Sequence, residues 1–335
     1  MYSGLSKLDL VEREVQSNMD EFIKNFGLIL NTTLMYTPPL LFAALGSVFS
    51  ERSGVVNIGI EGMMTIGAFA GVVGTLFTSN PWLGFLIAGL AGGIFGLLHA
   101  FATITCKADQ TISGTAINFL APGFAIFLCR VLYDSTETKS VDLAHKMPRF
   151  LNGLFQGTEG IFRKGGFLDN VFNTYATAYL AFILVAVVWF IFYKTKFGLR
   201  IRAVGEHPKA ADTLGINVIR IRYICVILSG VLAGFGGASV TLATVSQFRP
   251  SVITGQGFIA IAAVIFGKFK PQGAMLACIL FGFCNGVRVF VGSGSAVSPH
   301  LISMIPYVVT IIVLILFVGK SHVPAANGKP YEKAR

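Results

Sequence analysis

The chain alternates long apolar runs with short polar or charged segments. Many runs reach about 20 residues, the length that a helix needs to cross the hydrocarbon core of a bilayer. The pattern therefore predicts an all-α polytopic membrane protein with about nine spans. These spans cover residues 28–49, 58–78, 82–105, 110–133, 171–193, 222–246, 253–268, 273–293 and 301–319. The seventh run is too short to cross comfortably, which indicates a broken or re-entrant helix lodged within protein.

Basic residues between the runs predict the orientation of the chain. The loop from residue 194 to 222 is rich in lysine and arginine, with only Glu206 and Asp212 as acids. Cytoplasmic loops carry such an excess, so this loop should be cytoplasmic. Alternating the spans then puts the C-terminal tail, residues 321–335, inside and the N-terminus outside. The polar stretch 134–170 becomes an external loop between two halves of a transmembrane domain that covers 28–320.

The N-terminal segment, residues 1–27, is polar and acidic but has apolar residues at helical spacing. Either a helix lying along the membrane surface or a solvated tail fits this pattern. The repeated apolar positions are Leu8, Val11, Val15, Met19, Phe22 and Phe26.

The composition agrees with a membrane location and argues against nucleic acid or a metal ion as a binding partner. Hydrophobic residues make up 54% of the chain and charged residues only 13%, too few charges for a soluble domain of 335 residues. The net charge of +10 gathers in the loops, where it suits membrane lipid, and shows no basic groove for nucleic acid. The five cysteines are scattered without metal-ligand spacing, so neither a metal nor another cofactor is implied.

Two similar stretches suggest an inverted repeat. Residues 61–68 align with residues 256–263, and the same offset lays the first span over the sixth. The second span should run outward and the seventh inward, so the two copies would be inverted. Transporters with this architecture place the substrate path at the repeat interface near the membrane midplane. Chance similarity between small residues is the alternative.

Polar residues inside the apolar runs are candidates for a solute path. Asn57 and Glu61 lie where a glycine-rich turn enters the second span, and a carboxylate at that depth is costly unless it meets water or a partner. A structural role for Glu61 in capping a helix N-terminus is the alternative. Asn118, Gln256 and Asn285 could hydrogen-bond hydroxyl groups or base edges, or could instead join neighbouring helices.

Catalytic signatures are missing from the sequence. It has no GxxxxGK[ST], GxSxG or HExxH motif, and its histidines are dispersed. Arg288 lies near the outer end of its span, where snorkelling to the interface explains it better than solute contact. The chain is therefore predicted not to be an enzyme.

The cytoplasmic loop holds the most ordered motif. Pro208 can occupy the first turn of a helix and Gly215 can end it, so a short helix is predicted between Gly205 and Gly215. Such a helix could dock in the groove of a partner, although an ordinary solvated loop remains the alternative.

At this loop the sequence resembles the permease family of ATP-binding cassette importers for ribose, other sugars, branched-chain amino acids and nucleosides. The matching pairs are Phe197-Gly198, Val204-Gly205, Ala210-Ala211 and Gly215-Ile216. The resemblance implies that a cytoplasmic ATPase, which hydrolyses the ATP, docks on this loop. The residues expected to couple to it are Gly205, Glu206, Pro208, Ala210, Ala211 and Gly215.

Within the family, the sequence of residues 51–64 is most similar to that of the nucleoside-type permeases. The resemblance implies import of a small polar solute across the bacterial cytoplasmic membrane, together with a second homologous permease subunit and an extracellular solute-binding lipoprotein. A ribose-type sugar permease is the alternative within the family. An ion-coupled secondary carrier should show several intramembrane carboxylates, and a membrane scaffold would need no polar path.

Overall fold

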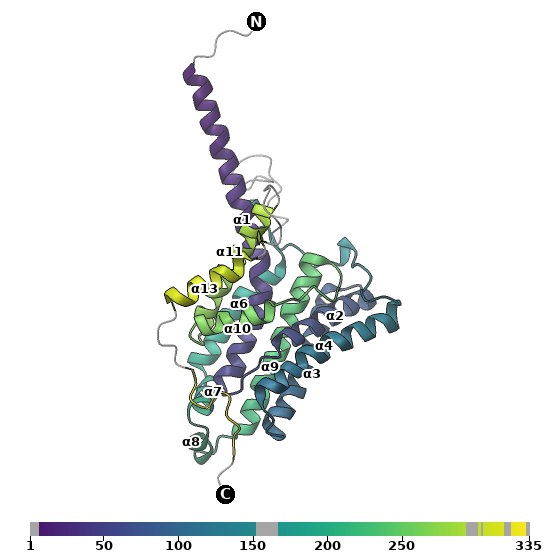
Figure 1. The fold of residues 1–335 in the computed structure, drawn as a ribbon, viewed down its shortest axis with the longest axis vertical. Helices are drawn as coiled ribbons and strands as arrows, with labels where there is room; N and C mark the ends of the chain where they lie inside the picture. Colours follow the sequence, from purple (N-terminus) through teal and green to yellow (C-terminus); the bar gives the residue numbers. More distant parts are fainter. Residues whose placement is uncertain (1–6, 152–166, 293–300, 303, 318–322, 333–335) are drawn as a thin grey trace.

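The computed structural model describes residues 7–151, 167–292, 301–302, 304–317 and 323–332. Helices dominate this part of the chain (Figure 1). The α-helices are α1 (Lys7–Arg52), α2 (Ile60–Thr78), α3 (Pro81–Ala100), α4 (Gln110–Tyr133), α5 (Phe167–Phe172), α6 (Ala176–Lys194), α7 (Lys196–Glu206), α8 (Pro208–Thr213), α9 (Val218–Ser239), α10 (Gln256–Phe266), α11 (Pro271–Gly292) and α13 (Ile305–Phe317). Short π-helical segments, η1 (Phe101–Thr105) and η3 (Val240–Val245), extend α3 and α9, and a 3-10 turn, η2 (Leu143–His145), lies between α4 and α5.

Within the described ranges, 7 helical segments are long and apolar enough to cross a membrane. They are Asn25–Arg52, Ile60–Thr78, Pro81–Thr105, Gln110–Tyr133, Ala176–Lys194, Val218–Val245 and Pro271–Gly292. Each overlaps one of the spans predicted from the sequence. The remaining two predicted spans correspond to the shorter helices α10, of 11 residues, and α13, of 13 residues. At about 1.5 Å per residue, α10 is too short to cross a bilayer, as its run of apolar residues predicts.

Helix α9 is central to the bundle because it packs against α1, α2 and α3. Small residues allow the backbones to approach closely, which is the usual way that helices associate without a hydrophobic driving force. A Cβ on Gly237 of α9 would lie 1.9 Å from the carbonyl oxygen of Met64 on α2, and one on Gly92 of α3 would lie 2.2 Å from the carbonyl oxygen of Gly230. No larger residue fits these crossings without moving a helix.

Helix α1 is 46 residues long and combines the predicted N-terminal segment with the first span. Its N-terminal part projects beyond the bundle at the end of the molecule opposite the C-terminus (Figure 1). Pro38 and Pro39 lie inside the helix. The segment from residue 7 is therefore helically continuous with the span, while its position relative to a membrane surface stays a prediction.

The described part of the predicted external loop, residues 134–151, folds back onto the connection between η3 and α10. The backbone N–H of Thr138 donates to the carbonyl of Phe248 (3.2 Å), and that of Val141 donates to the carbonyl of Ser246 (2.7 Å). Val141 is buried beneath this contact. The loop thus covers one end of the bundle, and its residues 152–166 lie outside the described ranges.

The short helix predicted after Pro208 is confirmed as α8, with Pro208 in its first turn. It ends in a Schellman motif: the N–H of Ile216 donates to the carbonyl of Ala211 (3.1 Å) and the N–H of Gly215 to that of Asp212 (2.9 Å). Gly215 has φ +79°, the left-handed conformation that this motif needs. Helix α7, just before it, was not predicted from the sequence. Both helices lie at the C-terminal end of the molecule (Figure 1).

Candidate solute path and coupling surface

The start of α2 is held by a side chain of α4. The Asn118 side chain accepts a hydrogen bond from the N–H of Gly62 through Oδ1 (2.8 Å) and donates from Nδ2 to the carbonyl of Ile58 (3.0 Å). Both ends of the amide are therefore used to join α4 to the first turn of α2. This geometry fits the interhelical role that was the alternative for Asn118, and its place in a solute path stays a prediction.

Asn57 is fully buried in the segment between α1 and α2. Its Nδ2 donates to the Ser229 hydroxyl on α9 (2.9 Å), whereas its Oδ1 has no hydrogen-bond partner among the described residues. The side chain thus ties the non-helical entrance of α2 to the central helix.

Glu61 joins α2 to the start of α10. Its Oε1 accepts the N–H of Gly255 (2.5 Å) and its Oε2 accepts the N–H of Gly257 (2.6 Å). The first N–H groups of a helix lack helical partners, and the helix dipole favours an anion beside them. The carboxylate therefore acts as a cap, the alternative given by the sequence, but for a helix nearly 200 residues away. A direct role in solute transport stays a prediction.

Gln256 and Asn285 line a polar cavity between α1, α10, α11 and α13. The cavity has two adjoining parts, of about 90 and 360 Å³, that share Tyr36, Thr254, Gln256 and Arg288. Asn285 belongs to the smaller part. The Asn285 amide donates to the carbonyl of Phe281 (3.0 Å) and the Gln256 amide to that of Val252 (3.4 Å). No described residue donates a hydrogen bond to either amide oxygen, so both can accept one from a solute.

Arg288 lines both parts of this cavity. The sequence instead predicts that its side chain reaches the membrane interface, because it lies near the outer end of its span. No carboxylate among the described residues lies within ion-pair distance of its guanidinium. A cation with five donors beside two free amide acceptors gives the cavity hydrogen-bonding groups of both kinds. The clue in the sequence was the charge itself, because a cation within an apolar span is costly unless it meets water or a polar partner.

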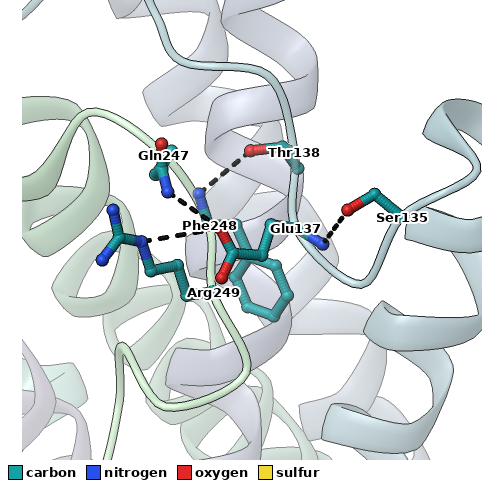
Figure 2. A network of polar contacts seen from close by, with 6 residues as sticks. All are labelled: Ser135, Glu137, Thr138, Gln247, Phe248 and Arg249. Atoms are coloured by element: carbon teal, nitrogen blue, oxygen red, sulfur yellow. Dashed lines mark hydrogen bonds and ion pairs between the residues drawn. The ribbon is translucent and has the colours of Figure 1, made fainter.

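A polar network at the edge of the larger part connects it to the external loop. Figure 2 shows Glu137 of the loop accepting a hydrogen bond from Gln247 Nε2 (3.0 Å), with the same carboxylate oxygen 3.7 Å from Arg249 Nε. Thr138 Oγ1 accepts the backbone N–H of Phe248 (3.0 Å). Since Arg249 also lines the cavity, the loop reaches its rim.

The predicted path residues therefore fall into two groups. Asn57, Glu61 and Asn118 organise the start of α2, while Gln256 and Asn285 line the cavity. The groups meet at the N-terminus of α10, where Glu61 holds Gly255 and Gly257 on either side of Gln256.

The residues predicted to couple to an ATPase gather around α7 and α8. Gly205 lies against the inner end of α1, where a Cβ would be 2.1 Å from the carbonyl oxygen of Arg52. Ala211 of α8 is buried, whereas Glu206 and Ala210 are exposed. One face of α8 thus packs on the bundle and the other is open to a partner.

A helical bundle with a polar cavity inside apolar helices, and a short helix at one end, has the architecture of a membrane transport protein. The family model for the branched-chain amino acid transport system / permease component matches residues 29–314. The chain belongs to this permease family.

Named relatives agree with the assignment. The guanosine ABC transporter permease protein NupQ of Bacillus subtilis is 43% identical, over 94% of this chain and 99% of its own. The nucleoside ABC transporter permease protein NupC of Lactococcus lactis is 41% identical, over 93% and 99% of the two chains. The putative glucose ABC transporter permease protein TsgC13 of Haloferax volcanii is 35% identical, over 85% and 90%. The protein is thus a multi-pass permease of the bacterial cytoplasmic membrane.

Proposed function

We propose that the protein is the membrane-spanning subunit of an ATP-driven importer of nucleosides. The cavity lined by Gln256, Asn285 and Arg288 is the observation that carries this proposal. A nucleoside is neutral and offers hydroxyl groups and base edges that both donate and accept hydrogen bonds, which matches amide oxygens beside a guanidinium. Tyr36 and Tyr307, also in the lining, can pack against a base.

ATP hydrolysis belongs to a separate cytoplasmic ATPase in this proposal, docked on α8. A second homologous permease subunit completes the membrane part, and an extracellular lipoprotein delivers the solute. The membrane domain then has about nine membrane segments, of which the re-entrant α10 and α13 are the two short ones.

An inverted repeat relating α1, α2 and α3 to α9, α10 and α11 is part of the proposal. Helix packing supports it: α3 lies on α9, and its counterpart α11 lies on α1. The aligned segments also touch each other, since a Cβ on Gly257 would lie 2.6 Å from the Cα of Glu61. The cavity beside α10 is close to this meeting point, where such transporters bind solute.

Uptake of labelled guanosine should disappear when the subunit is deleted, and should follow cellular ATP instead of the proton gradient. The reason is that the cavity has no carboxylate relay among its described residues, and the Glu61 carboxylate is held by two backbone N–H groups. Uptake is measured with ATP depleted, and separately with an uncoupler while ATP is held constant. Loss of uptake with the uncoupler alone would favour an ion-coupled carrier, and uptake of ribose or glucose but not of nucleosides would favour the sugar alternative.

Replacing Arg288 by Gln, or Asn285 by Leu, should raise the half-saturating nucleoside concentration about tenfold. The first variant removes a charged hydrogen-bond donor from the cavity, and the second removes an amide acceptor. The amount of protein in the membrane should stay the same. Gln272→Leu is the matched control, because Gln272 lies on the same helix with its side chain exposed. Unchanged transport in both cavity variants would place the solute path on other helix faces.

A further inference from the structure

The C-terminal tail folds back onto the bundle. The tail segment, residues 323–332, lies across the inner end of α1 and the link between α7 and α8. The N–H of Ala326 donates to the carbonyl of Gly205 (2.9 Å), and the N–H of Ala325 donates to the Glu206 carboxylate (3.3 Å). Asn327 Nδ2 donates to the carboxylate of Glu51 on α1. The tail segment is therefore bonded to two residues of the predicted coupling surface.

Arg222, at the start of α9, is buried beneath the tail segment. Its side chain is one of the largest fully buried groups among the described residues, with 2% of the residue exposed. Nη1 donates to the carbonyl of Lys329 (3.0 Å), while Nε and Nη2 have no hydrogen-bond partner in the described part of the chain. Burying a charge without an ion pair is costly. The packing of the tail over Arg222 therefore opposes folding at this point, which suggests that the tail is kept there for a function.

The tail segment and α8 enclose a groove of about 500 Å³. Pro208, Lys209 and Ala210 form the α8 side, and the tail contributes the other wall. The tail residues are Ala325, Ala326, Lys329, Pro330, Tyr331 and Glu332. The buried Arg222 also borders this groove, whose lining combines apolar and charged residues.

The exposed charged residues that line the groove are the basic Lys209 and Lys329 and the acidic Glu206 and Glu332. Glu332 is paired with Lys107 (2.9 Å), and the hydrogen bond from Lys107 lowers the pKa of Glu332. Glu206 accepts the N–H of Ala325. By contrast, the exposed Lys209 and Lys329 have no carboxylate within ion-pair distance in the described ranges, although the charge of Lys209 also helps to lower the pKa of Glu332. An acidic partner surface would therefore complement the groove.

We propose that the tail segment is the second wall of the ATPase docking site, and that the groove between it and α8 receives an acidic segment of the cytoplasmic ATPase. The proposal rests on the assignment of α8 as the coupling helix. It adds that docking needs the tail as well, because the tail forms one side of the groove and fixes Gly205 and Glu206 in place.

The test compares the amount of ATPase that co-purifies with the permease when all subunits of the importer are co-expressed. Ending the chain after His322 should lower the co-purified ATPase and the uptake at least about tenfold, while ending it after Glu332 should change neither. Lys209→Glu should lower ATPase recovery by a similar factor, because it places a negative charge against the acidic segment of the ATPase. Lys209→Arg keeps the positive charge and should leave ATPase recovery at the wild-type level. The Lys209 variants keep the tail, so they test the groove even if the shortened chain folds poorly.

Normal ATPase recovery and normal uptake with the chain ended after His322, or with Lys209→Glu, would overturn the tail's role and leave the importer assignment standing. If no ATPase co-purified with the full-length chain, the importer assignment itself would fall, and the docking site with it.

Discussion

Replacing Ala211 with proline is expected to abolish ATPase association and solute uptake while the chain still inserts into the membrane. The N–H of Ala211 donates to the carbonyl of His207 (3.0 Å) inside α8, and proline removes this donor. Helix breaking by proline costs about 3 kcal/mol locally. The short helix should unwind, and the movement of the ATPase would no longer reach the bundle.

A cysteine cross-link between α8 and the ATPase gives the direct measurement, since it should form in the wild-type background and fail in the variant. Ala211→Ser is the matched control, because it keeps the backbone donor and is nearly the same size. Full uptake by Ala211→Pro with the ATPase still bound would remove α8 from the coupling mechanism.

Replacing Gly237 with leucine should produce the largest loss of stability. Its Cβ position is 1.9 Å from the carbonyl oxygen of Met64, so the side chain would push α2 away from the central helix α9. Overpacking of this kind costs about 3 kcal/mol where the neighbour cannot move, and the neighbour here is backbone. The melting temperature of the detergent-solubilised protein, and its amount in the membrane, should both fall.

Gly123→Leu supplies the control for this experiment. Gly123 of α4 has nothing within 4 Å of its Cβ position, so the same substitution meets open space. Equal melting temperatures for the two variants would show that α2 and α9 do not cross as described.

Much of the fold could be predicted because each span carries its own signal. The predicted spans 58–78 and 110–133 coincide closely with Ile60–Thr78 and Gln110–Tyr133, since an apolar run of sufficient length is recognisable without its neighbours. The helix after Pro208 was predictable for the same reason, as its first-turn proline and its terminal glycine are local features. Helix α7 was missed because its basic residues favoured a loop, although its buried residues Gly198, Ile201, Val204 and Gly205 share one helix face.

The site was less predictable because its contacts are not local. Glu61 was recognised as a polar residue in an apolar run, but nothing in its surroundings indicates that it holds Gly255, 194 positions later. Arg288 was set aside for its position near a helix end, and the packing of α10 and α11 against each other and against α1 brings it beside Gln256 and Tyr36. The C-terminal tail was predicted only to be cytoplasmic, because its bonds to Gly205 and Glu206 use backbone N–H groups that no residue pattern reveals.

The two prolines of α1 make that long helix easier to bend at one point. Pro38 and Pro39 have no N–H, so the carbonyls of Leu34 and Met35 lose their helical partners, and the helix is less stiff at that level. The same stretch borders the cavity through Met35, Tyr36 and Pro39. The outer half of α1 can therefore bend about this point while the inner half, fixed at Arg52 by its hydrogen bond to the carbonyl of Phe269 (2.8 Å), stays in place. A hinge beside this cavity would let its outer end open and close independently of the cytoplasmic end.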